Sequence, residues 1–180
     1  FWANDGTNGN ELWKSDGTPG GTVLVKDIYP GAGSSTPTGT YIGSTVSYNN
    51  LLYFQAFDGT NGYELWQSDG TPGGTTLVKD IYPGGNGYPN GLTVCNGKLF
   101  FYATDANGVE LWMSDGTPGG TALLKDIKPG TAGSFPVNLF AWNDTLLFGA
   151  NDGGGSELWK SDGTLAGTVM IKNIWPGATT

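Results

Sequence analysis

The chain has 180 residues, 32 of them glycine and 10 proline, with a formal net charge of −8 and neither histidine nor arginine. A basic patch is needed to neutralise phosphates, so we expect no nucleic-acid partner. An anionic membrane surface would repel the chain. No apolar run reaches the roughly 18 residues of a membrane helix, so we also expect no membrane insertion.

One segment occurs four times in the sequence. The copies are ELWKSDGTPGGTVLVKDI, ELWQSDGTPGGTTLVKDI, ELWMSDGTPGGTALLKDI and ELWKSDGTLAGTVMIKNI, which begin at Glu11, Glu64, Glu110 and Glu157. The spacings of 53, 46 and 47 residues fit one four-stranded blade of a β-propeller. Glycines recur at fixed positions beside aromatic residues, which indicates the turns of a β-structure and excludes helix almost everywhere.

The predicted elements follow the repeats along the chain. Residues 1–33 are expected to form an incomplete first blade, because Phe1-Trp2 aligns with Phe101-Tyr102 of the third repeat and no first strand precedes it. Residues 34–84 form the second blade, residues 85–130 the third and residues 131–180 the fourth. Together they are one repeat domain, and we expect it to be part of a larger or oligomeric ring, because the terminal blades have no neighbours within the chain.

The third repeat predicts the strands of a blade most clearly. Strands are expected at 90–96, 98–104, 109–114 and 121–127, with Asn96-Gly97 providing the positive φ angles of a tight hairpin. Strands of this length, separated by regular turns, are typical of propellers and sandwiches. The fold class predicted is therefore all-β: a β-propeller of four-stranded antiparallel blades with four repeats.

Two repeated columns are interpreted as structural. A simple hairpin through the DGTPGG turn would place Trp13 opposite Leu24 and Glu11 opposite Lys26, and the same cross-strand charge pair would recur at 64/79, 110/125 and 157/172. A catalytic pair would be needed only once, whereas this pair is present in every copy. The repeated tryptophans at 13, 66, 112 and 159 are expected to fill the space between blades.

Acidic residues in the loops before each ELW strand leave two alternatives open. Asp5, Asp58, Asp105 and Asp152 occupy equivalent positions, and aspartate beside glycine in a loop normally accepts backbone N–H groups of its own turn. The alternative is a calcium site, since Ca²⁺ takes oxygen ligands from Asp, Asn and loop carbonyls. The loops lack the regular ligand ladder of an EF-hand. Calcium is the only cofactor that the sequence suggests.

Three tryptophans lie outside the repeated column. Trp2, Trp142 and Trp175 are expected near blade edges or connections, where an exposed aromatic ring could stack on a sugar. They are the candidate ligand-binding residues of the sequence. Cys95 is the only cysteine, and its place on a predicted strand indicates a small buried apolar residue rather than a reactive thiol.

The four ELWxSDGTxxGT segments resemble the ELWxxDGT repeat found in tandem in large secreted or cell-surface bacterial proteins. The resemblance implies an extracellular, propeller-like repeat module in a parent chain with more repeats, and it implies no catalytic residues. We therefore expect a non-enzymatic structural, adhesion or interaction module, located outside the cell or on a bacterial surface. It would assemble through blade–blade contacts with further copies of itself or of the same repeat array.

Two other functions remain open. The first is a carbohydrate-binding, lectin-type propeller, with or without a requirement for calcium, and with glycans as partners. The second is a glycosidase, which would need two carboxylates at a defined separation and one raised pKa. Chemistry based on histidine, and recognition of an anionic substrate by arginine, are excluded because the chain contains neither residue.

Overall fold

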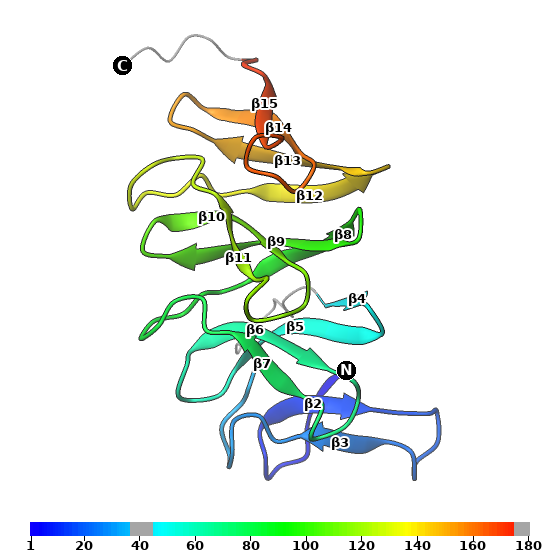
Figure 1. Ribbon diagram of the computed structural model, residues 1–180. Helices are drawn as coiled ribbons and strands as arrows, with labels where there is room; N and C mark the ends of the chain where they lie inside the picture. Colours follow the sequence, from blue (N-terminus) through cyan, green and yellow to red (C-terminus); the bar gives the residue numbers. More distant parts are fainter. Residues whose placement is uncertain (37–44, 175–180) are drawn as a thin grey trace. The chain divides into compact units, whose positions relative to one another are not determined.

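The structure is a computed structural model that describes residues 1–36 and 45–174. The described residues contain no helix, and their strands form four antiparallel sheets, which confirms the all-β prediction (Figure 1). Residues 1–36 and 45–174 therefore include no helix that could cross a membrane. The chain divides into two compact units, Phe1–Tyr88 and Pro89–Thr180, and each is described by itself.

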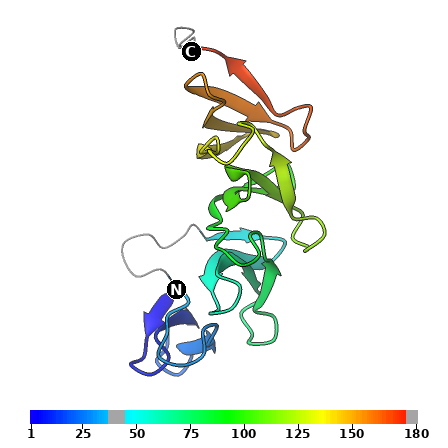
Figure 2. The same cartoon turned by 90° about the vertical axis from the view of Figure 1, so that its left-hand side faces the viewer.

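The first unit contains two sheets. Sheet 1 has three strands, β1 (Trp2–Asn4), β2 (Asn10–Lys14) and β3 (Val23–Lys26). Sheet 2 has four strands, β4 (Val46–Tyr48), β5 (Leu51–Phe57), β6 (Tyr63–Ser68) and β7 (Thr76–Lys79). In both sheets the strands follow one another as an antiparallel meander (Figure 2).

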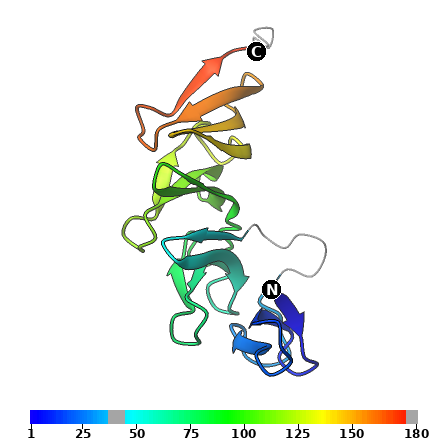
Figure 3. The ribbon, with the colours of Figure 1, turned by 90° about the vertical axis from the view of Figure 1, so that its right-hand side faces the viewer.

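The second unit contains two four-stranded sheets. Sheet 3 consists of β8 (Asn90–Cys95), β9 (Lys98–Asp105), β10 (Gly108–Ser114) and β11 (Ala122–Lys125), close to the predicted bounds. Sheet 4 consists of β12 (Val137–Trp142), β13 (Thr145–Asn151), β14 (Ser156–Ser161) and β15 (Val169–Lys172). Figure 3 shows the two sheets, green and orange to red, side by side. Asn96 and Gly97 join β8 to β9 with φ angles of 47° and 65°, as the sequence predicts.

Each sheet has two different faces, because side chains alternate along a strand. We call one the Leu face and the other the Trp face, after the adjacent residues of the ELW segment. The Leu faces carry Leu12, Leu65, Leu111 and Leu158, and the Trp faces carry Trp13, Trp66, Trp112 and Trp159.

Within each unit, the Leu face of the earlier sheet packs against the Trp face of the later sheet. In the first unit, Leu12 and Val25 of sheet 1 share a core with Phe54 and Trp66 of sheet 2. The prediction that the repeated tryptophan fills the space between sheets is confirmed for Trp66.

The second unit repeats the arrangement. Phe100 and Leu111 of sheet 3 share a core with Phe148 and Trp159 of sheet 4, so the prediction also holds for Trp159. Cys95 belongs to this core and is buried, as predicted. Burial raises the pKa of its thiol, which keeps the group protonated and unreactive at neutral pH.

The cross-strand register corrects one prediction. Trp13 stands opposite Leu24 as predicted, but a β-bulge between Leu12 and Trp13 places Lys26 opposite Leu12 rather than Glu11. The same irregularity recurs in the other three sheets, with Lys79, Lys125 and Lys172 opposite the leucine of their copy. The predicted Glu–Lys register is therefore wrong. The extra residue in one strand moves every later side chain by one position relative to its partner.

Candidate functional site

The SDGT turn is held together by its own repeated residues. In sheet 2, Asp69 Oδ1 accepts hydrogen bonds from the backbone N–H and the hydroxyl of Thr71, at 2.8 and 2.7 Å. These bonds hold the pKa of Asp69 below its ordinary value. The Thr75 hydroxyl donates to Thr71 O at 2.7 Å and is also bonded to Ser68 Oγ at 2.7 Å. Ser, Asp, Gly and both threonines of the motif are thus used by the turn.

A glycine in the same turn is required by close packing. A Cβ atom at Gly74 would collide with the carboxylate of Asp69, and the equivalent glycines 21, 120 and 167 meet the equivalent aspartates in the same way. The later Gly-Thr of the motif therefore has a steric role as well as a hydrogen-bonding one.

The repeated glutamate fastens the connection that leaves its sheet. Glu11 is fully buried, and its carboxylate accepts the N–H of Ile28 at 2.9 Å and the N–H of Ser35 at 3.0 Å. The Ser35 carbonyl in turn accepts the N–H of Phe57 in sheet 2 at 2.8 Å. The carboxylate therefore fixes the segment that leads from one sheet to the next.

The other copies preserve this glutamate contact. Glu64 accepts the N–H groups of Ile81 at 2.8 Å and Gly87 at 2.7 Å. Glu110 accepts those of Ile127 at 3.0 Å and Ser134 at 2.7 Å. Burial raises the pKa of Glu64 to about 7, against the opposing effect of the two N–H groups, and raises the pKa of Glu110 as well.

The repeated lysine reaches the next sheet. Lys26 Nζ donates to the Thr75 carbonyl of sheet 2 at 2.7 Å and lies 5.9 Å from the centroid of the Trp66 ring. Lys125 Nζ donates to the Thr168 carbonyl of sheet 4, also at 2.7 Å, and lies 5.8 Å from the Trp159 ring. The lysine thus serves the contact between sheets, which is a role that a cross-strand pair with glutamate would have prevented.

The candidate calcium ligands lie in four separate loops and each serves its own loop. Asp5 accepts the N–H groups of Thr7 and Asn8, both at 2.8 Å, which holds its pKa below the ordinary value. Asp58 is bonded in the same way to Thr60 and Asn61. Asp105 accepts the N–H of Asn107 at 2.7 Å and Asp152 that of Gly154 at 3.0 Å.

This geometry is that of an Asx turn, which is the alternative that the sequence left open beside calcium. In residues 1–36 and 45–174, no three His, Cys, Asp or Glu side chains are grouped to hold a metal ion. A calcium site at these loops would have to take most of its ligands from carbonyl and amide oxygens. Calcium binding stays a prediction.

The three candidate ligand-binding tryptophans differ from one another. Trp2 is half-buried and packs edge-on against Phe54 at a centroid distance of 5.4 Å, so it belongs to the core of the first unit. Its surroundings do not offer a free ring for stacking. Trp142 is 60% exposed. Trp175 lies outside the described residues.

Trp142 lies on an exposed apolar surface of sheet 4. A cavity of about 480 Å³ on the Leu face of this sheet is lined by Trp142, Thr145, Leu147, Lys160, Val169, Met170 and Ile171. The neighbouring residues Val137, Phe140 and Leu158 are also exposed. We call this surface, Val137, Phe140, Trp142, Leu158, Val169 and Ile171, the sheet 4 apolar surface.

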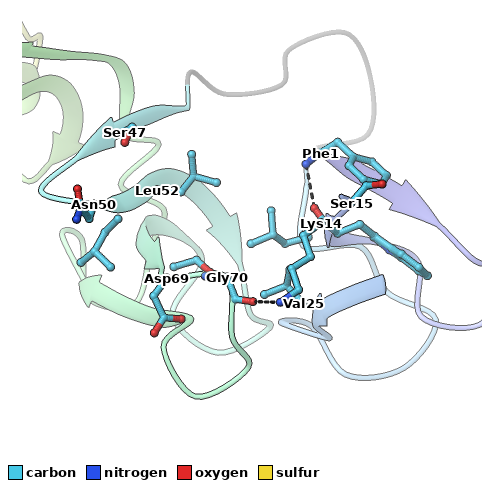
Figure 4. Close-up of a pocket in the computed structure, with 13 residues that line it drawn as sticks. Phe1, Lys14, Ser15, Val25, Ser47, Asn50, Leu52, Asp69 and Gly70 are labelled. Atoms are coloured by element: carbon cyan, nitrogen blue, oxygen red, sulfur yellow. Dashed lines mark hydrogen bonds between the residues drawn. The ribbon is translucent and has the colours of Figure 1, made fainter. Parts of the chain in front are cut away.

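A second cavity lies inside the first unit (Figure 4). It has a volume of about 500 Å³ and lies between sheets 1 and 2, lined by residues that include Leu52, Val25 and Asp69. Lys14 crosses it and donates to the Gly70 carbonyl at 2.8 Å. In the second unit the corresponding region is occupied by β8, whose Thr93 hydroxyl reaches Leu139 O of β12 at 3.4 Å. In the described residues, sheet 1 has three strands and none at this position, which leaves the cavity between sheets 1 and 2 open.

No protein-family model matches the chain, and no curated protein or solved structure matches it either. The site must therefore be judged by its geometry. The sequence singled out Trp142 but missed the apolar surface around it. Alternation in VNLFAW, which separates Phe140 and Trp142 from Leu139 and Ala141, was the available signal.

Proposed function

We propose that the chain is a non-enzymatic structural or adhesion module that assembles through contacts between sheet faces. The sheet 4 apolar surface carries this proposal, since six large apolar side chains exposed on one side of a sheet are typical of an interaction site. The motif residues support it from the other direction. Glutamate, tryptophan, aspartate and threonine are all engaged in turns, connections and sheet packing.

The sheets would be the blades of a β-propeller or of a propeller-like array. Four similar repeats and two instances of the same face-to-face packing support this arrangement. The resemblance to tandem ELWxxDGT repeats supports a location outside the cell or on a bacterial surface. Further copies of the chain, or of the same repeat, are the proposed partners.

Light scattering on a concentration series tests assembly directly. We expect the weight-average mass to rise above the 18.8 kDa of one chain as the concentration increases through the micromolar range. The proposal would be contradicted if the mass stayed at that of a single chain up to a protein concentration of about 1 mM. At that concentration, only association with a Kd well above about 1 mM would escape detection.

A second candidate function is carbohydrate binding at the sheet 4 cavity. The exposed ring of Trp142 provides an apolar platform, and Thr145 and Lys160 beside it provide hydrogen-bond groups. This is the combination by which proteins bind sugars. A glycan array with and without calcium is the test: binding that is lost in Trp142→Ala but kept in Trp2→Ala would favour it, and an array with no signal would exclude it for the glycans presented.

A further inference from the structure

The Leu face of sheet 4 is exposed at positions that are buried or half-buried in both sheets whose Leu face is covered within a unit. Leu158 is 41% exposed, whereas Leu12 and Leu111 are 3% and 0% exposed. Ile171 is 47% exposed, and its equivalent Val25 in sheet 1 is 3% exposed. Sheet 4 therefore has the same apolar columns as sheets 1 and 3, but no sheet formed by residues 89–174 covers them.

The Trp face of sheet 1 is likewise more exposed than the Trp face of sheet 4. The backbone of Phe1 is hydrogen-bonded to that of Trp13. Phe1 is 57% exposed, whereas the equivalent residues Phe54 and Phe148 are 0% and 1% exposed. Trp13 is half-buried, while its equivalent Trp159 is buried. Sheet 1 therefore presents the aromatic pair that covers the Leu face in each unit, and no sheet formed by residues 1–36 and 45–88 packs on that pair.

Each unit also shows which polar contact accompanies the packing. Lys26 and Lys125 are half-buried and donate to carbonyls of the following sheet, those of Thr75 and Thr168. The equivalent lysine in sheet 4, Lys172, is exposed. The carbonyl equivalent to its partners on sheet 1 is that of Thr22.

We propose that the chain self-associates head to tail, with the Leu face of sheet 4 in one copy packed on the Trp face of sheet 1 in a second copy. Lys172 then donates to the Thr22 carbonyl of the second copy and lies over its Trp13 ring. The proposal rests on the assembly function proposed above and specifies the two surfaces involved. The occupant is a second copy because the interface seen twice within the chain joins these same two kinds of face.

The lysine distinguishes this arrangement from a symmetric one. Two sheet 4 surfaces packed on each other would bring two Lys172 side chains into one interface and leave both without the carbonyl that they bind in the internal interfaces. Burying unpaired charges of the same sign is costly. The head-to-tail contact gives each lysine an acceptor and each apolar column the partner that it has in the two units.

The test uses a variant of each face. Ile171→Glu places a charge on the sheet 4 apolar surface, and Phe1→Glu places one on the Trp face of sheet 1. Both side chains are largely exposed within the chain, so we expect native circular dichroism and thermal unfolding. Leu165→Glu is the control, since Leu165 is 63% exposed in the turn before β15 and lies on neither face. The mass of each variant, and of the mixture, is measured by light scattering.

We expect each face variant to lose self-association by at least about tenfold, which corresponds to about 1.4 kcal/mol, while Leu165→Glu associates like the original chain. An equimolar mixture of the two face variants should form a heterodimer and nothing larger, because one variant keeps an intact sheet 1 and the other an intact sheet 4. Lys172→Gln, which keeps the surface apolar, should weaken association severalfold.

Other outcomes separate this proposal from the function on which it rests. If the original chain associates but Phe1→Glu still forms dimers, the contact is symmetric through sheet 4 and the head-to-tail arrangement is overturned, while assembly stands. Association that survives in both face variants also overturns it. If the original chain stays monomeric, the assembly function and the head-to-tail contact fail together.

Discussion

Glu64 shows how a single residue can join two elements at the expense of a buried charge. Its carboxylate is fully buried and accepts the N–H groups of Ile81 and Gly87 in the connection that follows β7. Removal from water favours the protonated form, and the pKa rises to about 7. A folded-state pKa above the ordinary 4.5 means that the folded protein binds the proton more tightly than the unfolded chain.

The change Glu64→Gln tests this at the residue scale. The stabilising contribution of Glu64 is largest below pH 4.5, falls as the pH rises, and is constant above about pH 7. Glutamine has no such dependence, and its NH₂ group faces an N–H donor, which we expect to cost about 1–3 kcal/mol. The measurement is urea unfolding from pH 5 to 8: the stability advantage of the original chain over the variant should shrink as the pH rises.

A constant difference between the two proteins over this range would contradict the raised pKa.

The repeated lysines illustrate what sequence could not predict at this scale. The amino-acid composition of a strand does not indicate a β-bulge. The sequence therefore predicts Lys26 opposite Glu11, whereas Lys26 lies opposite Leu12 and donates to the following sheet. The Asx turns of the loop aspartates were one of the two alternatives that the sequence left open, because the hydrogen bonds of such a turn depend only on neighbours in sequence.

At the scale of elements, the four hairpin turns have the same hydrogen bonds in different surroundings. Thr75 and Thr22 both donate to the carbonyl four residues earlier at 2.7 Å and both pair with a serine hydroxyl at 2.7 Å. Thr75 is fully buried, whereas Thr22 is exposed. Water can replace a lost partner only around Thr22.

We therefore expect Thr75→Val to destabilise the chain by about 1–3 kcal/mol and Thr22→Val by less than about 1 kcal/mol. The shape of the side chain is nearly unchanged in both, so burial of the remaining donors and acceptors is what differs. Chemical denaturation of the two variants beside the original chain measures the difference. Equal losses would show that the hydrogen bonds, and not their burial, determine the stability of the turn.

Most of the elements could be predicted from the sequence. Asn96-Gly97 and alternation of apolar residues gave the strands of sheet 3 nearly to the residue, because both signals are local. The place of Trp2 could not be obtained in this way. It lies at the edge of its sheet, yet it packs against Phe54 of the next sheet, and sequence patterns do not report contacts between separate sheets.

At the scale of the whole molecule, net charge opposes the association that the apolar surfaces favour. Sixteen acidic and eight basic residues give a charge of −8, so copies of the chain repel one another at low ionic strength. Salt screens this repulsion over about 10 Å at 0.1 M and leaves apolar contact intact.

Self-association should therefore strengthen severalfold when sodium chloride is raised from about 0.02 to 0.5 M, because the Debye length falls well below molecular dimensions. Sedimentation velocity at a fixed protein concentration measures the change. Weakening with salt would instead point to a contact held by ion pairs, and the sheet 4 apolar surface would then not be its basis.

The difference between the two faces of each sheet has a consequence for the number of repeats that can pack in a row. A repeat that presents a Leu face on one side and a Trp face on the other has the two surfaces that the packing inside each unit joins. Joining the repeat of sheet 1 directly to that of sheet 4 would recreate the pairing of surfaces already present in each half of the chain. We therefore expect a chain with one repeat fewer or one repeat more to keep the same kind of interface between neighbouring sheets.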